Sequence, residues 1–376
     1  MTTQLTRVSK PTATSAPPVA RRQILTPFVA VILLASLIVA VAIGPASLAS
    51  ASAVSGPITA MDIVGSAWHH LTSWLSSSGF DIQATTNPLS PVRDAIIWDG
   101  RMPRALTAAA VGAGLAICGV VLQATTRNPL ADPYLLGISS GASLGAVAVL
   151  ILGWALPLPI AAFVGAMAAL VTTLALAGWG DRLQAGRVLL AGIAVAQACS
   201  AAVSLVIFTT AQGDSYRNVL GWLMGTLGAA RWSSVLVTGI AVLVLGAVLM
   251  GFGRTLDGFA FGDISATSLG INVVATRWLL LVLTALLTGA LVSMSGAIGF
   301  VGLTVPHVVR LLPGVGPGNP ALLRASALVG AVFLLWADTI ARTAFAPLDI
   351  PVGVLTALIG APVFAVLLLR SRRRIS

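Results

Sequence analysis

The sequence predicts an all-α integral membrane protein with ten transmembrane helices and with both termini in the cytoplasm. Hydrophobic residues make up 57% of the 376 positions and charged residues only 9%, and the mean hydropathy is +0.99. No water-facing surface could be built around so large an apolar fraction, so the solvent must be lipid. The basic residues, which give a net charge of +10, gather in alternate loops, and this asymmetry indicates an oriented membrane protein rather than a nucleic-acid binder.

Ten apolar segments match the length of about 20 residues that crosses a hydrocarbon core of roughly 30 Å. They lie near 25–46, 104–124, 135–154, 157–179, 187–209, 232–252, 277–295, 298–312, 322–341 and 352–370. The eighth is short and is interrupted by Gly299, Gly302 and Pro306. The first follows Arg21 and Arg22 and ends in small residues, as a cleavable signal would, but its length favours a retained helix.

The loops between these segments define the domain organisation. Residues 1–24 are rich in Thr, Ser, Pro and Arg, which predicts a disordered cytoplasmic tail before a membrane domain over 25–376. That domain includes an extracytoplasmic insert at 50–100 and a cytoplasmic loop at 253–276. Fifteen of the 21 basic residues then fall inside and six outside, as the positive-inside rule requires. The segments 112–121 and 289–298 resemble each other and run in opposite directions, a weak inverted repeat.

Several kinds of chemistry are excluded by residue types that the chain lacks. The only lysine, Lys10, is preceded by no glycine, so no P-loop can bind ATP on this chain. A proton-coupled carrier would hold ionisable groups at mid-membrane, and here only Asp338 approaches the interior of a span. Arg342, one turn later, predicts an i, i+4 ion pair with it. We therefore expect no catalytic residue, and a carrier, channel or scaffold protein is the less favoured interpretation.

The histidines and cysteines predict structural roles. His69, His70 and His307 offer no ligand set at helical spacing, so we expect no metal site and no cofactor. The adjacent His69 and His70, with Trp68 and Trp74 nearby, favour a surface aromatic helix that lies on the membrane over a haem or metal contact. Both cysteines, Cys118 and Cys199, lie in apolar runs, where packing between helices is favoured over a disulfide.

Residues 101–142 read RMPRALTAAAVGAGLAICGVVLQATTRNPLADPYLLGISSGA, and this segment closely resembles the FecCD-type permeases of ferric-siderophore, haem and cobalamin ABC importers. The resemblance continues in LLAGIAVA at 189–196, GWLMGTL at 221–227, FGDISATSLGI at 261–271, GAIGFVGLTVPHVVRLL at 296–312 and LDIPVGVLTALIGAPVFAVLLLR at 348–370. It is dense from about 101 to 370 and loose over the first span.

This resemblance implies a multi-pass permease of the inner cell membrane that imports a ferric siderophore, with haem or cobalamin as alternatives. It implies cytoplasmic ATP-binding subunits that hold ATP and Mg, and an extracytoplasmic substrate-binding protein. It also implies a second permease subunit, with a homodimer favoured and a heterodimer possible. No nucleic acid is expected as a partner.

The resemblance further implies roles for residues on the two sides of the membrane. Arg101, Arg104 and Arg342 match exposed arginines that receive acidic residues of the binding protein, although lipid-headgroup anchoring is the simpler alternative. Gly262, Asp263, Leu269 and Gly270 match the loop that couples to the ATPase, for which an ordinary amphipathic connector is the alternative. The acid that usually follows Asp263 is replaced by Ile264, and the sequence leaves open whether Asp257 compensates.

Two further groups complete the predicted site residues. Asn128 and Leu130 match a cytoplasmic gate, with Ala185 and Gly186 at its other constriction, where hydroxyl residues are often found. Pro306, His307, Asp349, Pro351 and Gly353 match structural motif positions. Asp349 stands where the family usually has glutamate, which keeps the carboxylate with a shorter reach.

Overall fold

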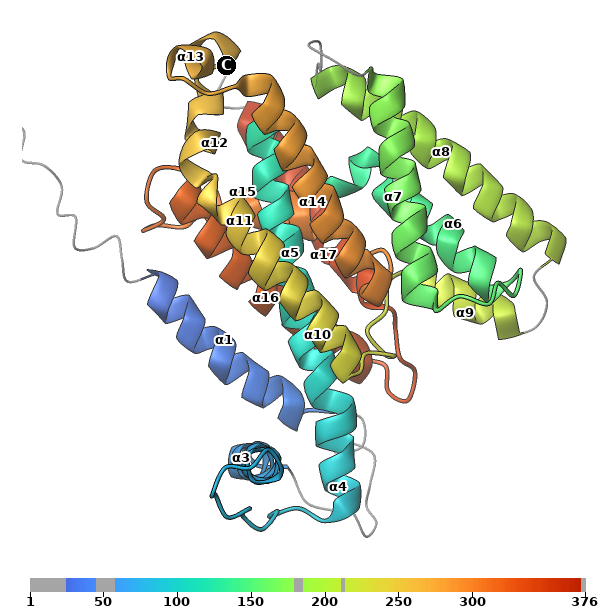
Figure 1. The fold of residues 1–376 in the computed structure, drawn as a ribbon, viewed down its shortest axis with the longest axis vertical. Helices are drawn as coiled ribbons and strands as arrows, with labels where there is room; N and C mark the ends of the chain where they lie inside the picture. The colour runs from blue at the N-terminus through green and yellow to red at the C-terminus, as the bar shows by residue number, and fades with distance from the viewer. Residues whose placement is uncertain (1–24, 45–57, 179–184, 211–213, 373–376) are drawn as a thin grey trace, which may run out of the picture.

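The computed structural model describes residues 25–44, 58–178, 185–210 and 214–372, and within these ranges every regular element is a helix (Figure 1). Two segments named above, the predicted tail at 1–24 and the run of small residues after the first span at 45–57, lie outside the described residues.

The helices follow one another along the chain with short connections. In order they are α1 (Leu25–Ala42), α3 (Ala60–Ser77), α4 (Pro91–Ala95), η2 (Ile96–Arg101), α5 (Met102–Thr126), η3 (Pro133–Leu136), α6 (Ile138–Leu150), α7 (Leu158–Ala177), α8 (Ala185–Thr210), α9 (Asp214–Leu223), α10 (Trp232–Ala241), η4 (Val242–Gly246), α11 (Ala247–Gly251), α12 (Gly253–Ala260), α13 (Asp263–Ser268), α14 (Val273–Ser295), α15 (Val301–Leu311), α16 (Asn319–Thr343) and α17 (Val352–Arg372). The elements η2 and η4 are π-helical turns inside longer helices, and η3 is a 3-10 turn.

Seven helical stretches in the described part of the chain are long and apolar enough to cross a membrane. They are Leu25–Ala42, Pro91–Thr126, Leu158–Ala177, Gly186–Thr210, Trp232–Gly251, Val273–Ser295 and Asn319–Thr343. The shorter apolar helices Ile138–Leu150, Val301–Leu311 and Val352–Val366 coincide with the third, eighth and tenth predicted spans. Each predicted span thus contains a helix, while the count of ten crossings and the side of the termini stay predictions.

The second span is longer than its hydropathy indicates. The apolar pattern begins at 104, yet the helix runs without a break from Pro91 to Thr126. Pro91 occupies the first helical turn, where a missing N–H does no harm. The charged residues Arg93, Asp94 and Asp99 lower the local hydropathy without disfavouring the helix. Arg101 and Arg104 therefore project from a continuous helix instead of a loop.

Two hydrophobic cores organise the bundle. The first is formed mainly by α1, α5, α10, α12 and α14 to α16. The second is formed mainly by α6, α7 and the start of α8. Helix α14 contributes Leu287 and Leu291 to the first core and Leu281 and Ala285 to the second, so it joins the two halves.

Helix α5 packs backbone to backbone on two neighbours. A Cβ atom added at Gly112 would lie 2.2 Å from the carbonyl oxygen of Gly330 in α16. One added at Gly119 would lie 1.9 Å from the carbonyl oxygen of Gly302 in α15. Small residues are what allow helices to approach so closely in a membrane, where van der Waals contact drives association. These glycines make α5, α15 and α16 one close-packed unit.

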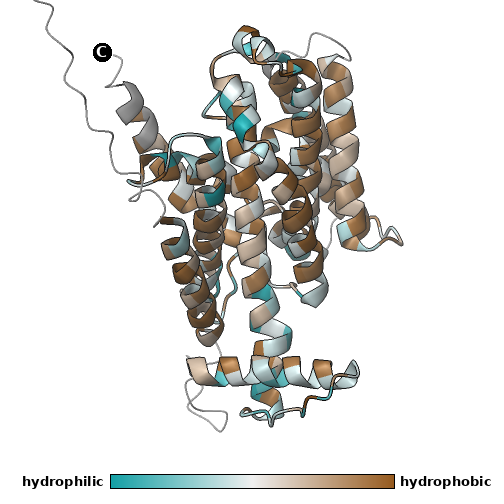
Figure 2. Ribbon diagram, turned by 60° about the vertical axis from the view of Figure 1, so that its left-hand side comes forward, coloured by the Kyte–Doolittle hydropathy of each residue, from teal (hydrophilic) through white to brown (hydrophobic). Residues whose placement is uncertain are grey.

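The two ends of the bundle carry different elements. Helices α3 and α4 lie at one end of the long axis, and α12 and α13 lie at the other (Figure 1). The spans between them are mostly hydrophobic, and α3 lies across their ends instead of along them (Figure 2). The segments that matched binding-protein docking and ATPase coupling are therefore on opposite faces.

Candidate functional site

At the α3 end, Arg104 is held by two carboxylates. Its Nε donates to both oxygens of Asp338 at 3.0 Å, and its Nη1 donates to Oδ2 of Asp349 at 3.1 Å. Asp338 is 1% exposed, whereas the Asp349 side chain is 56% exposed. Nη2 of Arg104 also lies 3.0 Å from Asp338 Oδ1, so two nitrogens of the guanidinium face this carboxylate. Arg104 thus has one buried, permanent partner and one at the surface.

Arg101 and Arg342 both hold the end of α1. Arg101 donates to the carbonyl oxygens of Val41 and Ala42, at 3.1 and 2.8 Å, and Arg342 donates to that of Ala40. The last carbonyls of a helix have no partner within it, so these side chains complete the end of α1. Only 7% of Arg101 and 4% of Arg342 is exposed. The expectation of exposed arginines is therefore wrong for these two residues.

The three predicted arginines nevertheless converge. Together with Asp349 they line a pocket of about 400 Å³, which is completed by Ile96, Gly100 and Gly228. The predicted ion pair is also present, because Arg342 Nε lies 3.7 Å from Asp338 Oδ2. The bidentate pair of Asp338 with Arg104 was missed. The signal for it was an acid inside an apolar span, which needs a close cation.

At the opposite end, two arginines fix Asp263. Nη2 of Arg277 lies 3.0 Å from Asp263 Oδ1, and Nη2 of Arg127 lies 3.5 Å from the same oxygen. Gly262 precedes α13 with φ +95°, and Gly270 follows it with φ +82°, values that favour glycine. The predicted coupling residues thus form a short helix that is bounded by two sharp turns and tied to the ends of α5 and α14.

Three exposed apolar side chains lie on this helix or within two residues of it. Phe261, Ile264 and Leu269 are 75%, 86% and 68% exposed. Asp257 Oδ1 accepts from the backbone N and side-chain Nδ2 of Asn319, at 2.7 and 2.9 Å, so this carboxylate is held against the start of α16. Exposed apolar side chains on a small helix are typical of a protein contact.

A sequence comparison decides the family. The profile of the FecCD transport family matches residues 63–370 of this chain. The chain belongs to the FecCD transport family. It is a permease of the ABC importer type.

The permease is similar to proteins from distant organisms. It is 43% identical over 283 residues to the hemin transport system permease protein HmuU of Yersinia pestis, an alignment that covers 73% of this chain and 83% of that protein. It is 45% identical over 271 residues to the cobalamin import system permease protein BtuC of Halobacterium salinarum, which covers 71% of this chain and 72% of that protein.

A solved structure extends the similarity to the fold. It is described as an inward-facing conformation of a metal-chelate type ABC transporter, and it matches the permease with a TM-score of 0.74 at 28% identity. The match covers 92% of this chain and 99% of that one. The all-helical bundle is therefore an ABC transporter permease fold.

The candidate gate of the permease is a turn after α5. Arg127 ends the helix with φ +52°, and Asn128 Oδ1 accepts from the backbone N of Leu130 at 2.9 Å. This Asx-type turn presents Leu130, which is 41% exposed. Gly186, in the first turn of α8, has open space where a Cβ would be, and Ala185 begins that helix. A gating role for these four residues stays a prediction.

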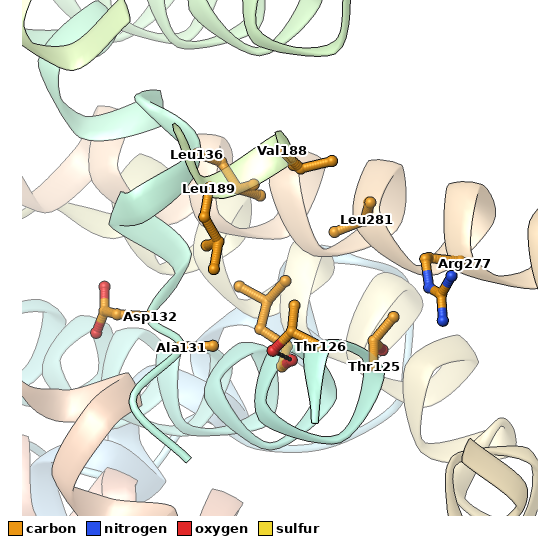
Figure 3. A pocket seen from close by; sticks show the side chains of 10 residues that line it. Thr125, Thr126, Ala131, Asp132, Leu136, Val188, Leu189, Arg277 and Leu281 are labelled. Carbon is orange, nitrogen blue, oxygen red and sulfur yellow. Dashed lines mark hydrogen bonds between the residues drawn. The ribbon is translucent and has the colours of Figure 1, made fainter. Parts of the chain in front are cut away.

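Behind this turn lies a small pocket (Figure 3). Aliphatic residues from α5, η3, α8 and α14, among them Leu122, Leu136 and Leu281, line it, and its volume of about 10 Å³ has room for one water molecule at most. Loss of water around the Asp132 carboxyl raises its pKa to about 6. The hydrogen bond that this carboxyl accepts from the backbone N–H of Tyr134 acts in the opposite direction and lowers the pKa.

The predicted structural motif residues also have defined places. Pro306 lies inside α15 and is buried, and His307 beside it is half-buried. A Cβ at Gly353 would lie 1.9 Å from the Met224 carbonyl oxygen, so the start of α17 packs directly on the turn after α9. Pro351 precedes that helix, and Asp349 reaches back to Arg104.

Proposed function

We propose that this permease imports a large iron chelate, a ferric siderophore in the first instance, delivered by a substrate-binding protein and driven by ATP hydrolysis on separate cytoplasmic subunits. The observation that supports the proposal is that the arginine pocket and the α12–α13 segment lie at opposite ends of α5. Haem or cobalamin is the second candidate, because relatives over 40% identical are named for hemin and cobalamin transport.

The arginine pocket supports docking of the binding protein. It presents guanidinium groups in a cavity of about 400 Å³, which suits carboxylate side chains from a partner. Asp349 holds only one nitrogen of Arg104 and is largely exposed. A carboxylate of the binding protein can exchange with it while the buried Asp338 pair stays intact. The Arg104 guanidinium then keeps a carboxylate partner throughout docking and release of the binding protein.

The α12–α13 end supports coupling to the ATPase. Ile264 and Leu269 provide an apolar contact on a helix that is fixed by charged residues. Helix α12 packs on α5 and α16. A displacement of this end therefore reaches the central helices directly.

The pathway in this proposal lies between two permease subunits, with a homodimer favoured. The gate pocket within one chain admits no more than a water molecule. Helix α8 exposes Leu190 and Phe208, at 69% and 91%, and α17 exposes Leu358 at 67%. These faces are available for a second copy. The proposed location is the inner cell membrane with both termini in the cytoplasm.

Uptake by the reconstituted system tests the function. The permease is placed in liposomes with its ATP-binding subunit and binding protein, and ferric siderophores, hemin and cobalamin are offered separately. We expect ATP-dependent accumulation of a ferric siderophore. Accumulation of hemin or cobalamin alone would favour the second candidate, and uptake driven by a pH gradient without the ATPase would contradict the importer mechanism.

The coupling surface gives a sharper prediction. The variant Ile264→Ser/Leu269→Ser is expected to lose association with the ATP-binding subunit. Burial of each apolar side chain in the contact would contribute about 1.5–3 kcal/mol to the free energy of association. Co-purification and substrate-stimulated ATPase activity measure the effect. The control is Ser268→Ala on the same helix, where only a hydrogen bond to the Ile264 carbonyl is lost. Wild-type association of the double variant would refute this contact.

A further inference from the structure

Helix α3 turns its polar side toward the rest of the protein. Ser66 Oγ donates to Asp94 Oδ1 at 2.5 Å, and His70 Nε2 lies 2.8 Å from Asp94 Oδ2. The His70 ring stacks on Trp98, with 3.9 Å between ring centroids and 7° between planes. Thr72, also buried, contacts Thr85 Oγ1 at 3.2 Å. Hydrogen bonds, together with one stacked ring, thus attach this helix to α4 and its neighbours.

The outward side of α3 is apolar. Met61, Val64, Trp68 and Leu71 are 81%, 54%, 56% and 44% exposed. Their positions follow the i, i+3, i+7 and i+10 spacing that places residues on one helical face. Trp74, 63% exposed, lies at its edge. Of the three buried residues of α3 only Ile63 is apolar, so the arrangement is largely the reverse of a helix on a protein in water, where the apolar stripe faces the core.

The position of α3 indicates what covers this face. The helix lies across the ends of the spans (Figure 2) and packs against α1. Helix α1 is itself apolar and exposed, with Phe28, Val31 and Leu34 at 59%, 64% and 64%, so its outer surface faces lipid. Helix α3 therefore lies beside this apolar surface of α1, at the end of the bundle.

We propose that α3 is an interfacial anchor whose face of Met61, Val64, Trp68 and Leu71 is inserted among the lipid headgroups and the first acyl carbons. Tryptophan is enriched at this depth, because its ring is amphipathic. The helix contains one charged residue, Asp62, whose carboxylate closes a capping box with Thr59. Without lysine or arginine, the anchor is held by apolar burial and does not need anionic lipid.

The anchor has a mechanical consequence for the arginine pocket. The carboxylate of Asp94, which is hydrogen-bonded to Ser66 and His70 of α3, lies in the same unbroken helix as Arg101 and Arg104. A helix fixed in the bilayer surface therefore sets the height at which these arginines stand.

Spin-label accessibility tests the anchor. Val64→Cys and Leu71→Cys are each labelled in a background in which Cys118 and Cys199 are replaced by alanine, and the full permease with its ATPase is placed in phosphatidylcholine nanodiscs. Ser77→Cys, on the opposite side of the same helix, is the matched control. We expect the ratio of collisions with oxygen to collisions with a water-soluble nickel chelate to be at least about threefold higher at 64 and 71 than at 77, as for insertion to about 5–10 Å.

Each other result would overturn the proposal. A ratio equal to that at 77 would place the face in water. Protection from both oxygen and nickel would mean that a protein covers it. A ratio that rises only when phosphatidylglycerol is added would contradict apolar anchoring. Met61→Cys, at the most exposed position, provides a second site on the same face if a label at 64 or 71 disturbs folding.

Discussion

Replacing Gly119 by valine is expected to destabilise the helix bundle of the permease strongly. A Cβ at this position lies 1.9 Å from the carbonyl oxygen of Gly302 and 2.8 Å from its Cα. Both are backbone atoms of α15, so no side chain can rotate away to make room. Overpacking a core by a few carbons usually costs about 1–3 kcal/mol, and a clash with the main chain of a neighbouring helix lies at or above the upper end of that range.

Thermal unfolding of the purified protein measures this effect. A loss of about 3 kcal/mol corresponds to roughly 6–12 °C in Tm, at about 2–4 °C per kcal/mol for chains of 150–250 residues. The control is Gly239→Val in α10, where nothing lies within 4 Å of an added Cβ. Equal Tm values for the two variants would show that the contact between α5 and α15 is looser than described.

The second large effect is expected from Arg104→Gln. Asp338 is then left buried, with Arg342 at 3.7 Å as its remaining cation. Removing one partner of a buried pair typically costs about 3–5 kcal/mol, because the other charge stays without compensation. Replacing both partners, in Arg104→Gln/Asp338→Asn, leaves two neutral amides, while the buried Arg342 loses its carboxylate and keeps its bond to the Ala40 carbonyl oxygen. We expect the double variant to recover part of the lost stability.

This pair of variants also separates stability from docking. If Arg104 receives a carboxylate of the binding protein, the double variant remains folded and yet binds that protein more weakly, and transport falls with it. Tm and surface plasmon resonance on nanodisc-embedded permease give the two readouts. Docking at wild-type affinity in the double variant would remove Arg104 from the interface, and a double variant no more stable than Arg104→Gln would contradict the pairing with Asp338.

Local and family-level features of the permease could be predicted from sequence. The predicted apolar segments all contain helices, because burial in lipid depends on the composition of each segment alone. The Asp338–Arg342 pair is also local, one turn apart in α16. The helical nature of the segment around Trp68 and His70 follows from its residue pattern in the same way.

Contacts between distant segments could not be predicted in this way. Arg104 and Asp338 are 234 positions apart, and only the packing of α5 on α16 brings them together. The burial of Arg101 depends likewise on the end of α1, about 60 residues earlier. The hydropathy pattern gives the apolar part of the second span but not the start of its helix, because the charges near Asp94 conceal a helix that begins at Pro91.

Helix α5 connects the arginine pocket at one end of the bundle with the α13 segment at the other. Arg101 and Arg104 stand at its beginning, and Arg127 at its end contacts Asp263 of α13. The close backbone contacts of its glycines with α15 and α16 fix the middle of the helix, so the three helices form a rigid unit. A rigid unit of this kind tilts or shifts as a whole. If the proposed ATPase contact displaces the α13 end, we expect the arginine pocket at the other end of α5 to be displaced with it.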